Sequence, residues 1–263
     1  MVELIKQVLA IIPTYFQELV SLVSGPKRFI AELDSRRELT IKKSLIFLAI
    51  SFFIVSVLHI PLTQGDLLND LAASSIFTLL NVSAHACVMY WAWRLVGGSA
   101  PLGKILPVYF YYAGVIELIM MVTYLVAVGG MKTADPAGYR QIIEAILAES
   151  VLEYFRQHGE ELLARPALLV GGLIVVAGFG VAMAWLIAGW GAFRQLSGLP
   201  KLRSIPAGCL FVLFSVPVTV LTLCVAKALT PAPKQNMPIP SQKSGQAGNS
   251  GAVAPAPALN NNP

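Results

Sequence analysis

The sequence predicts an all-α fold: a polytopic membrane helix bundle with five transmembrane helices. Two observations predict it. Hydrophobic residues make up 56% of the 263 residues and charged residues only 13%, whereas a soluble domain carries roughly 25% charged residues. In addition, five apolar stretches are each long enough to cross a hydrocarbon core about 30 Å thick, which takes roughly 20 helical residues. They cover residues 44–62, 71–93, 105–128, 167–193 and 207–226, and together they place the membrane domain at residues 44–226.

The segment before the first span, residues 1–43, is expected on the cytoplasmic side. From residue 2 to residue 23, apolar side chains such as Leu4, Val8 and Ile12 recur at helical spacing, with Glu3 and Lys6 between them. This pattern predicts an amphipathic helix that lies in the membrane interface, with a bend at its proline. A helix that docks on a partner protein is the alternative interpretation.

The third connection, residues 130–166, is predicted to be a helical insert on the outer side. Asp135 followed by Pro136 is a typical helix start, because the carboxylate caps free backbone N–H groups and the proline lacks a donor that would otherwise stay unpaired. Beyond this start, a stripe of apolar residues is opposed by five glutamates. We expect one or two short helices whose apolar face rests on the membrane or on the rim of the bundle.

The last segment, residues 227–263, is predicted to be a disordered tail. Its composition changes abruptly to Pro, Ala, Asn, Gln, Ser and Gly, with three lysines and no aromatic residue. Such a segment cannot bury enough apolar surface to offset the entropy lost on ordering.

The distribution of basic residues predicts the orientation. Of the 19 lysines and arginines, twelve lie before the first span or in the second and fourth connections, and the positive-inside rule places these regions in the cytoplasm. Five spans then put the N-terminus inside and the C-terminus outside. The expected location is the bacterial inner membrane, with membrane lipids as partners. The net charge of +5 is explained by this topology signal, so no nucleic-acid partner is expected.

The fourth span carries a small residue at every fourth position: Gly180, Ala184, Ala188 and Ala192. Small side chains let a neighbouring helix approach closely, and close packing stabilises helix pairs in lipid. Packing inside the bundle is the first interpretation of this face. A seam between two copies in a homo-oligomer is the alternative.

Glu117 interrupts the apolar third span. A charged acid at the centre of a span costs about 2.5 to 3.5 kcal/mol on insertion scales, so this side chain is expected to face the protein interior, to be paired or to be protonated. If the second and third spans form a hairpin, His85 lies at a similar depth, and Asn81 is one turn away on the same helix. The three form a candidate polar cluster. It is either a hydrogen-bonded structural pin or a proton or ion relay.

Signatures of catalysis and of cofactor binding are missing from the sequence. Gly178, Gly180 and Met183 give only a fragment of a dinucleotide fingerprint, inside an apolar span with no preceding strand. The three cysteines fall inside predicted spans, and no paired metal-ligand spacing accompanies them. We therefore expect a protein that is not an enzyme and has neither a cofactor nor a metal site.

Residues 24–29 read Ser-Gly-Pro-Lys-Arg-Phe and precede a basic stretch and the five spans. In this order of segments the chain resembles bacterial members of the Yip1 family, which have a cytoplasmic segment with a proline motif, then five helices with the N-terminus inside. The resemblance covers roughly residues 20–226. It implies a non-enzymatic integral membrane protein that acts as a scaffold or organising factor through an unidentified membrane or peripheral protein partner. A small ion- or proton-coupled transporter that uses Glu117 and His85 is the alternative function.

Overall fold

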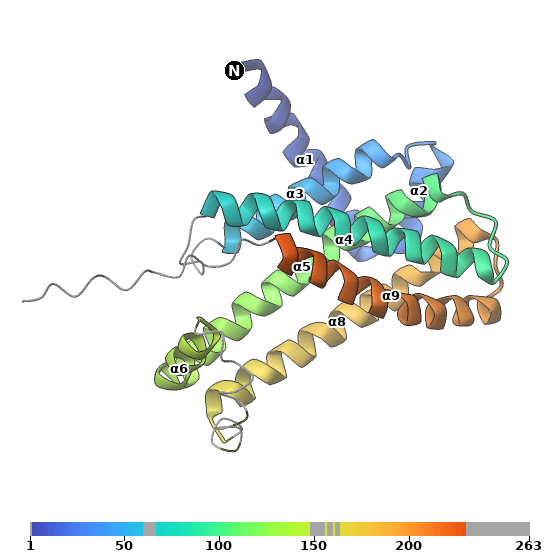
Figure 1. The fold of residues 1–263 in the computed structure, drawn as a ribbon. Coiled ribbons are helices and arrows are strands. Elements are labelled where there is room, and N and C mark those ends of the chain that lie inside the picture. The colour runs from blue at the N-terminus through green and yellow to red at the C-terminus, as the bar shows by residue number, and fades with distance from the viewer. Residues whose placement is uncertain (1, 60–66, 148–155, 157–159, 161–163, 230–263) are drawn as a thin grey trace, which may run out of the picture.

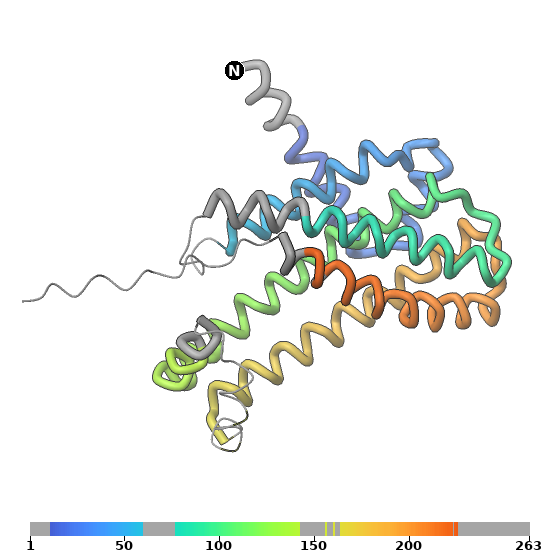
Figure 2. Tube along the Cα trace, viewed as in Figure 1, coloured from blue at the N-terminus to red at the C-terminus, as the bar shows by residue number. Residues whose placement is uncertain are grey.

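A computed structural model describes residues 2–59, 67–147, 156, 160 and 164–229, and within these residues every regular element is a helix. Figure 1 shows the arrangement of the helices and Figure 2 their Cα trace. The helices are α1 (Val2–Ser24), α2 (Pro26–Ser35), α3 (Ile41–His59), α4 (Leu67–Leu95), α5 (Leu102–Ala134), α6 (Pro136–Leu147), α8 (Pro166–Ser197) and α9 (Lys201–Leu229).

Four of these helices, α3, α5, α8 and α9, are long and apolar enough to cross a membrane, which indicates an integral membrane protein. Helices α5, α8 and α9 contain the third, fourth and fifth predicted spans, and α3 covers residues 44–59 of the first. The last three residues of the first span lie outside the described residues. The second predicted span lies in α4, which has 29 residues but is not one of the four. Helix α5 runs several residues past its predicted span at both ends, because Lys104 and Lys132 near these ends can reach the polar interface.

The longest helices, α5 and α8, lie side by side as an antiparallel pair (Figure 1). α6 packs against both of them, where the C-terminal end of α5 lies beside the N-terminal end of α8. Glycines of α8 allow this close approach. Gly189 lies against the Tyr112 ring, where an added Cβ would come within 2.5 Å of the ring, and Gly178 lies directly against Thr123. The Tyr112 hydroxyl donates a hydrogen bond of 2.9 Å to the Gly189 carbonyl. Small residues of α8 therefore allow close contact between α5 and α8 at two positions along the pair.

Of the predicted packing face of the fourth span, only Ala192 is buried in the bundle. Gly180, Ala184 and Ala188 are all exposed on the surface of the described chain, and a Cβ added to Gly180 would meet nothing within 4 Å. The internal face lies on the other side of α8, where Gly171, Gly178 and Gly189 face α5. A spacing of four residues identified one small-residue face, but α8 has two such faces. A homo-oligomer that uses the exposed face stays a prediction.

At the opposite end of the α5–α8 pair, several connections meet. The Ser99 backbone N–H and hydroxyl both donate to the Ser197 carbonyl, at 3.1 and 3.2 Å, so the α4–α5 and α8–α9 connections lie together. Lys104 at the start of α5 pairs with Asp34 of α2 at 2.8 Å. The ends of the helices that carry most basic residues are thus gathered on one side of the bundle.

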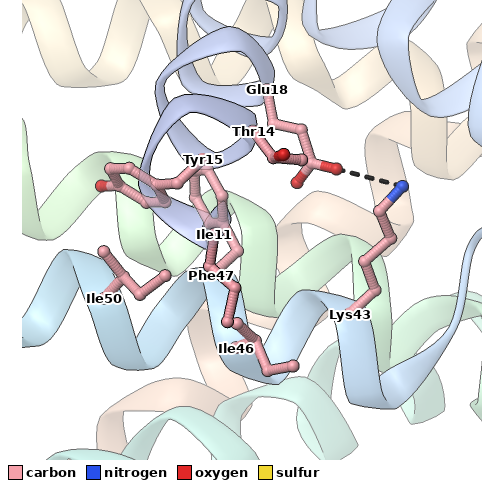
Figure 3. Close-up of a pocket in the computed structure, with 8 residues that line it drawn as sticks. All are labelled: Ile11, Thr14, Tyr15, Glu18, Lys43, Ile46, Phe47 and Ile50. Carbon is pink, nitrogen blue, oxygen red and sulfur yellow. Dashed lines mark ion pairs between the residues drawn. The ribbon is translucent and has the colours of Figure 1, made fainter. Parts of the chain in front are cut away.

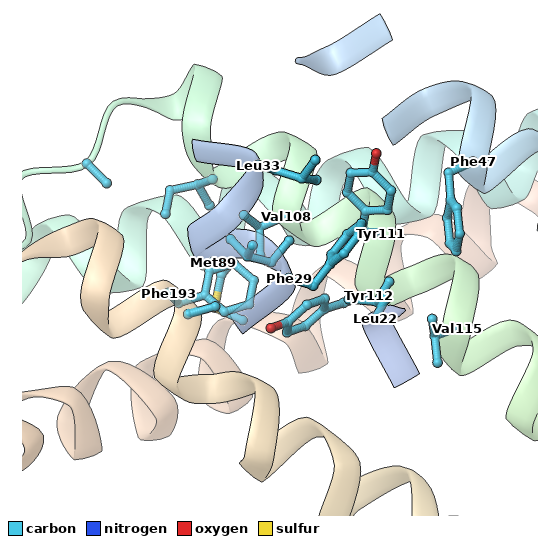
Figure 4. Packing of buried hydrophobic residues seen from close by; sticks show 14 of the residues in the cluster. Leu22, Phe29, Leu33, Phe47, Met89, Val108, Tyr111, Tyr112, Val115 and Phe193 are labelled. Atoms are coloured by element: carbon cyan, nitrogen blue, oxygen red, sulfur yellow. The ribbon is translucent and has the colours of Figure 1, made fainter. Parts of the chain in front are cut away.

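The main hydrophobic core lies beneath this end and includes the N-terminal helices (Figure 4). Leu22 of α1 and Ile30 of α2 are buried with Val108 and Tyr111 of α5. The helix predicted over residues 2–23 is confirmed as α1, with its proline inside it. Gly25 separates it from α2, which begins with Pro26 at its first position. The second half of α1 is an integral part of the bundle.

The insert begins as predicted. The Asp135 carboxylate accepts a 2.8 Å hydrogen bond from the Gly138 backbone N–H and lies 3.7 Å from the Arg165 guanidinium, and α6 starts at Pro136. Ile142 of α6 is buried. The rest of the predicted insert, apart from a few residues, and the predicted tail from residue 230 onward lie outside the described residues.

The two faces of α8 can be told apart by a matched pair of substitutions. We expect Gly178→Ala to lower stability by about 1 to 3 kcal/mol, because the new methyl group overfills the contact with Thr123. Gly180→Ala should leave stability unchanged or raise it by about 0.5 to 1 kcal/mol, since alanine favours a helix over glycine. Thermal unfolding in detergent measures both. Equal effects of the two substitutions would show that the packing face is assigned incorrectly.

Candidate functional site

The predicted polar cluster lines a cavity of about 260 Å³ between α4, α5, α8 and α9. The cavity exists because α9 packs mainly against α4, while α8 packs mainly against α5, and the two pairs leave space where they face each other. The polar side chains in its wall are Asn81, His85, Tyr109, Tyr112, Glu117 and Thr219. The hairpin of α4 and α5 thus brings Glu117, His85 and Asn81 to one site, as the sequence predicts.

His85 is held between α4 and α9. Its Nδ1 lies 2.8 Å from the Asn81 carbonyl oxygen and its Nε2 lies 3.1 Å from the Thr219 hydroxyl. A carbonyl can only accept, so Nδ1 carries a hydrogen and donates it. A neutral His85 then has a free lone pair on Nε2, which accepts a hydrogen bond from Thr219.

The Thr219 hydroxyl has a second acceptor within reach, because it lies 2.8 Å from the Ser215 carbonyl oxygen of its own helix. A hydroxyl has one hydrogen. If Thr219 donates it to Ser215, Nε2 of His85 must donate to Thr219, and the imidazole then carries a hydrogen on both nitrogens and a positive charge. If Thr219 donates to His85, the Ser215 carbonyl loses this bond. The direction of the Thr219 hydroxyl therefore decides whether Nε2 of His85 accepts or donates.

A second bond of the same kind lies beside the first. The Thr222 hydroxyl lies 3.2 Å from the Asn81 side-chain oxygen. Asn81 and His85 are spaced by four residues on α4, and Thr219 and Thr222 by three on α9, so each pair lies on one helix face. Sequence reasoning missed the two threonines, because a threonine in an apolar helix commonly bonds to a carbonyl of its own helix and gives no sign of an interhelical contact.

Glu117 has a different environment. Within the described part of the chain its carboxyl makes no hydrogen bond and no ion pair, although it lines the same cavity as His85. Among the described contacts Glu117 and His85 share no hydrogen bond, and both ring nitrogens of His85 face Asn81 and Thr219. The structural pin is therefore made by His85 with α9, and Glu117 is left as an acid in the cavity wall.

The described residues contain no group of three or more His, Cys, Asp and Glu side chains that could hold a metal ion. The three cysteines are separate and exposed on the surface of the bundle. The ionisable groups that line the cavity are one carboxyl group, one imidazole and two phenols.

The second feature with functional geometry is the contact of α1 with the bundle, which lines a pocket of about 240 Å³ (Figure 3). Lys43 of α3 bridges two acids, Glu18 of α1 at 3.1 Å and Glu38 at 2.9 Å. The hydrogen bond and charge of Lys43 lower the pKa of Glu38. The Tyr111 hydroxyl donates to Glu18 at 3.2 Å. These contacts tie α1 to both α3 and α5.

The depth of α1 can be measured along α3. Glu18 contacts Lys43, near the charged end of α3, whereas the Tyr15 hydroxyl bonds to Ser51 at 2.9 Å. Ser51 lies eight residues, or about 12 Å, further along α3 than Lys43. The Glu18 side of α1 therefore faces the charged end of the bundle, and its Tyr15 side faces the middle.

His85 and Glu117 should respond differently to replacement by leucine. We expect His85→Leu to lower stability by about 1 kcal/mol, because it removes one of the two described hydrogen bonds between α4 and α9. Glu117→Leu should raise stability by about 1 to 2 kcal/mol, since it removes an unpaired acid from the membrane domain. Thermal unfolding in the same detergent compares the two, with Glu117→Gln as a control of similar shape. A loss of stability in Glu117→Leu would show that Glu117 has a structural partner.

Comparisons with known proteins leave the family open. No protein-family model, no curated protein and no solved structure matches the chain. The resemblance to the Yip1 family therefore depends on the motif at Gly25–Pro26 and the order of the segments alone.

Proposed function

We propose that the protein is a non-enzymatic integral membrane protein that organises the membrane around it, with α1 as an in-plane helix in one leaflet. One observation carries the proposal: α1 has three distinct faces. The first, with Tyr15, Leu19 and Leu22, packs against the bundle. The other two are exposed, and one of them is apolar and the other polar.

The exposed apolar face consists of Ile12, Phe16, Val20 and Val23, which are 40 to 66% exposed. Since successive helical residues are turned by about 100°, this face lies on the side of α1 away from Glu18 and next to Tyr15 and Leu19. It therefore points toward the middle of the bilayer. Acyl chains of the leaflet are the partner that fits an apolar face at this depth.

The exposed polar face consists of Thr14, Gln17, Ser21 and Ser24. It lies toward the side of Glu18 and Lys43, where the charged ends of the helices meet the headgroups. An in-plane helix needs this order, with water and headgroups on one side and acyl chains on the other. The Trp185 indole N–H donates to the Val23 carbonyl at 3.2 Å and holds the end of α1 against α8.

The finer topology belongs to the same proposal. We place α4 as a fifth span, because it runs antiparallel to α5 and α9 and packs against both. The end that gathers Asp34, Lys104, Ser99 and Ser197 then faces the cytoplasm, the N-terminus is inside and the C-terminus is outside the inner membrane. This arrangement agrees with what the resemblance to the Yip1 family implies, a scaffold that works through lipid or protein partners.

Orientation can be tested with single cysteines in a variant whose three native cysteines are replaced by alanine. Ser99→Cys and Gly198→Cys should react with an impermeant maleimide only from the cytoplasmic side, because their connections lie together. Thr133→Cys, at the other end of α5, should react only from the outside. Reaction of Ser99→Cys and Gly198→Cys from opposite sides would contradict the fold.

The depth of α1 can be tested in the same background. A fluorophore on Val20→Cys should be quenched by lipids that carry a nitroxide deep in the acyl chain, and one on Gln17→Cys by lipids that carry it at the headgroup. The two positions differ by less than one turn, so the contrast reports the side of the helix. Stronger deep quenching at residue 17 than at residue 20 would exclude the proposed orientation.

The organising role itself is tested by sorting on curvature, because a helix wedged into one leaflet prefers a curved membrane. Reconstituted protein should have a higher density in small vesicles than in large ones. Phe16→Gln with Val20→Gln should abolish this preference, whereas Gln17→Asn, on the polar face, should keep it. Equal sorting of all three proteins would refute the role of α1.

A further inference from the structure

The polar side chains that line the cavity between α4, α5, α8 and α9 are of two kinds: those with a hydrogen-bond partner in the protein and those without one among the described contacts. Asn81, His85, Tyr112 and Thr219 each have a hydrogen-bond partner in the protein. Among the described contacts, Glu117 and Tyr109 have none. Both are on α5, eight residues apart with Ala113 between them, so they lie along one face about two turns apart.

Charge limits what can occupy this cavity. An ionised Glu117 is an acceptor with no cation of the described protein bonded to it, in a segment that crosses the membrane. Ionisation is costly there unless a positive charge is close. His85 is the other ionisable group that lines the cavity besides the tyrosines, but its two nitrogens are turned to Asn81 and Thr219. The carboxyl is therefore free to pair with a cation that enters from outside the protein.

The other wall groups indicate which kind of cation fits. Aromatic rings of Tyr109, Tyr112, Phe193 and Phe211 line the cavity, and their faces attract organic cations. Ca²⁺ and Mg²⁺ take six or more oxygen ligands, whereas the cavity wall offers one carboxylate and a few neutral amide and hydroxyl oxygens. Aliphatic groups of Val82, Ile116 and Leu186 complete the lining. Aromatic and aliphatic walls with one acid are suited to an ammonium group on an apolar body.

We propose that this cavity is a binding site for a small organic cation, an amine or quaternary ammonium compound, with Glu117 as its counter-ion. The volume of about 260 Å³ holds a small molecule of this class. Tyr109, whose hydroxyl has no hydrogen bond to the described residues, is placed to contact a polar group of the ligand at the end nearer the cytoplasmic side. The site is separate from α1, so cation binding here does not depend on whether α1 organises the membrane.

A ligand can enter the cavity on the side of α9. α9 packs mainly against α4, and most of its other surface is exposed. Its bonds to α4 are those of Thr219 and Thr222 described above, and Pro217 lies inside the helix between Ser215 and Thr219. A proline in a helix interior removes a backbone hydrogen bond and lets the helix bend. Bending of α9 at this level would widen the cavity beside Thr219.

The test uses the full chain in lipid nanodiscs and three probes: choline, tetraethylammonium and 3,3-dimethyl-1-butanol, the uncharged carbon isostere of choline. Calorimetry should show binding of at least one cation and no binding of the alcohol at the same concentrations. Glu117→Gln should weaken cation binding at least tenfold. Glu32→Gln, the same change at an exposed acid of α2, should have no effect.

A second measurement keeps the proposal testable if Glu117→Gln fails to fold. Dicyclohexylcarbodiimide modifies carboxyl groups in apolar surroundings, and mass spectrometry of the unmutated protein reports modification of Glu117. The bound cation should slow this modification severalfold, whereas the alcohol should not. The proposal is overturned if neither cation binds, if the alcohol binds as well as choline, or if the cations leave the modification rate of Glu117 unchanged.

Discussion

One turn of α5 organises the described bundle. Tyr109 contacts Phe211 of α9 with ring centroids 6.3 Å apart, and Phe110 packs with Leu48 of α3 and Val82 of α4. The next two residues, Tyr111 and Tyr112, contact other helices. Tyr111 packs edge-on against Phe29 of α2 and donates to Glu18 of α1, and Tyr112 donates to the Gly189 carbonyl of α8. Because four consecutive side chains point in four directions, this turn fixes the helices around it.

The polar groups of the membrane domain fall into two functional kinds. Most are used for structure: His85 and Asn81 join α4 to α9, Tyr112 joins α5 to α8, and Ser51 joins α3 to α1. Each of these bonds satisfies a group that lipid could not satisfy. Glu117 belongs to the other kind, since it faces a cavity and joins nothing among the described residues. A polar group that is costly in a membrane and structurally unused is a candidate for ligand chemistry.

The faces of α1 also have different surroundings. Its inner face completes the core with Leu22, its outer face presents Phe16 and Val20, and its polar edge faces the charged end of the bundle. A soluble protein would bury that outer face. Helix α8 also exposes apolar side chains, with Phe179 and Ile187 as examples.

The sequence by itself determined the elements: the apolar stretches became long helices, α1 followed its helical periodicity, and Asp135 with Pro136 began α6. These are local properties, because span length, periodicity and capping depend on neighbouring residues. Only the tertiary structure decided which faces meet. In lipid every face of a span can be apolar, so composition did not distinguish Gly178, which packs against Thr123, from Gly180, which is exposed. His85 likewise bonds to Thr219, 134 residues away, while Glu117 has no partner among the described residues. Such contacts depend on the shapes of distant segments brought together.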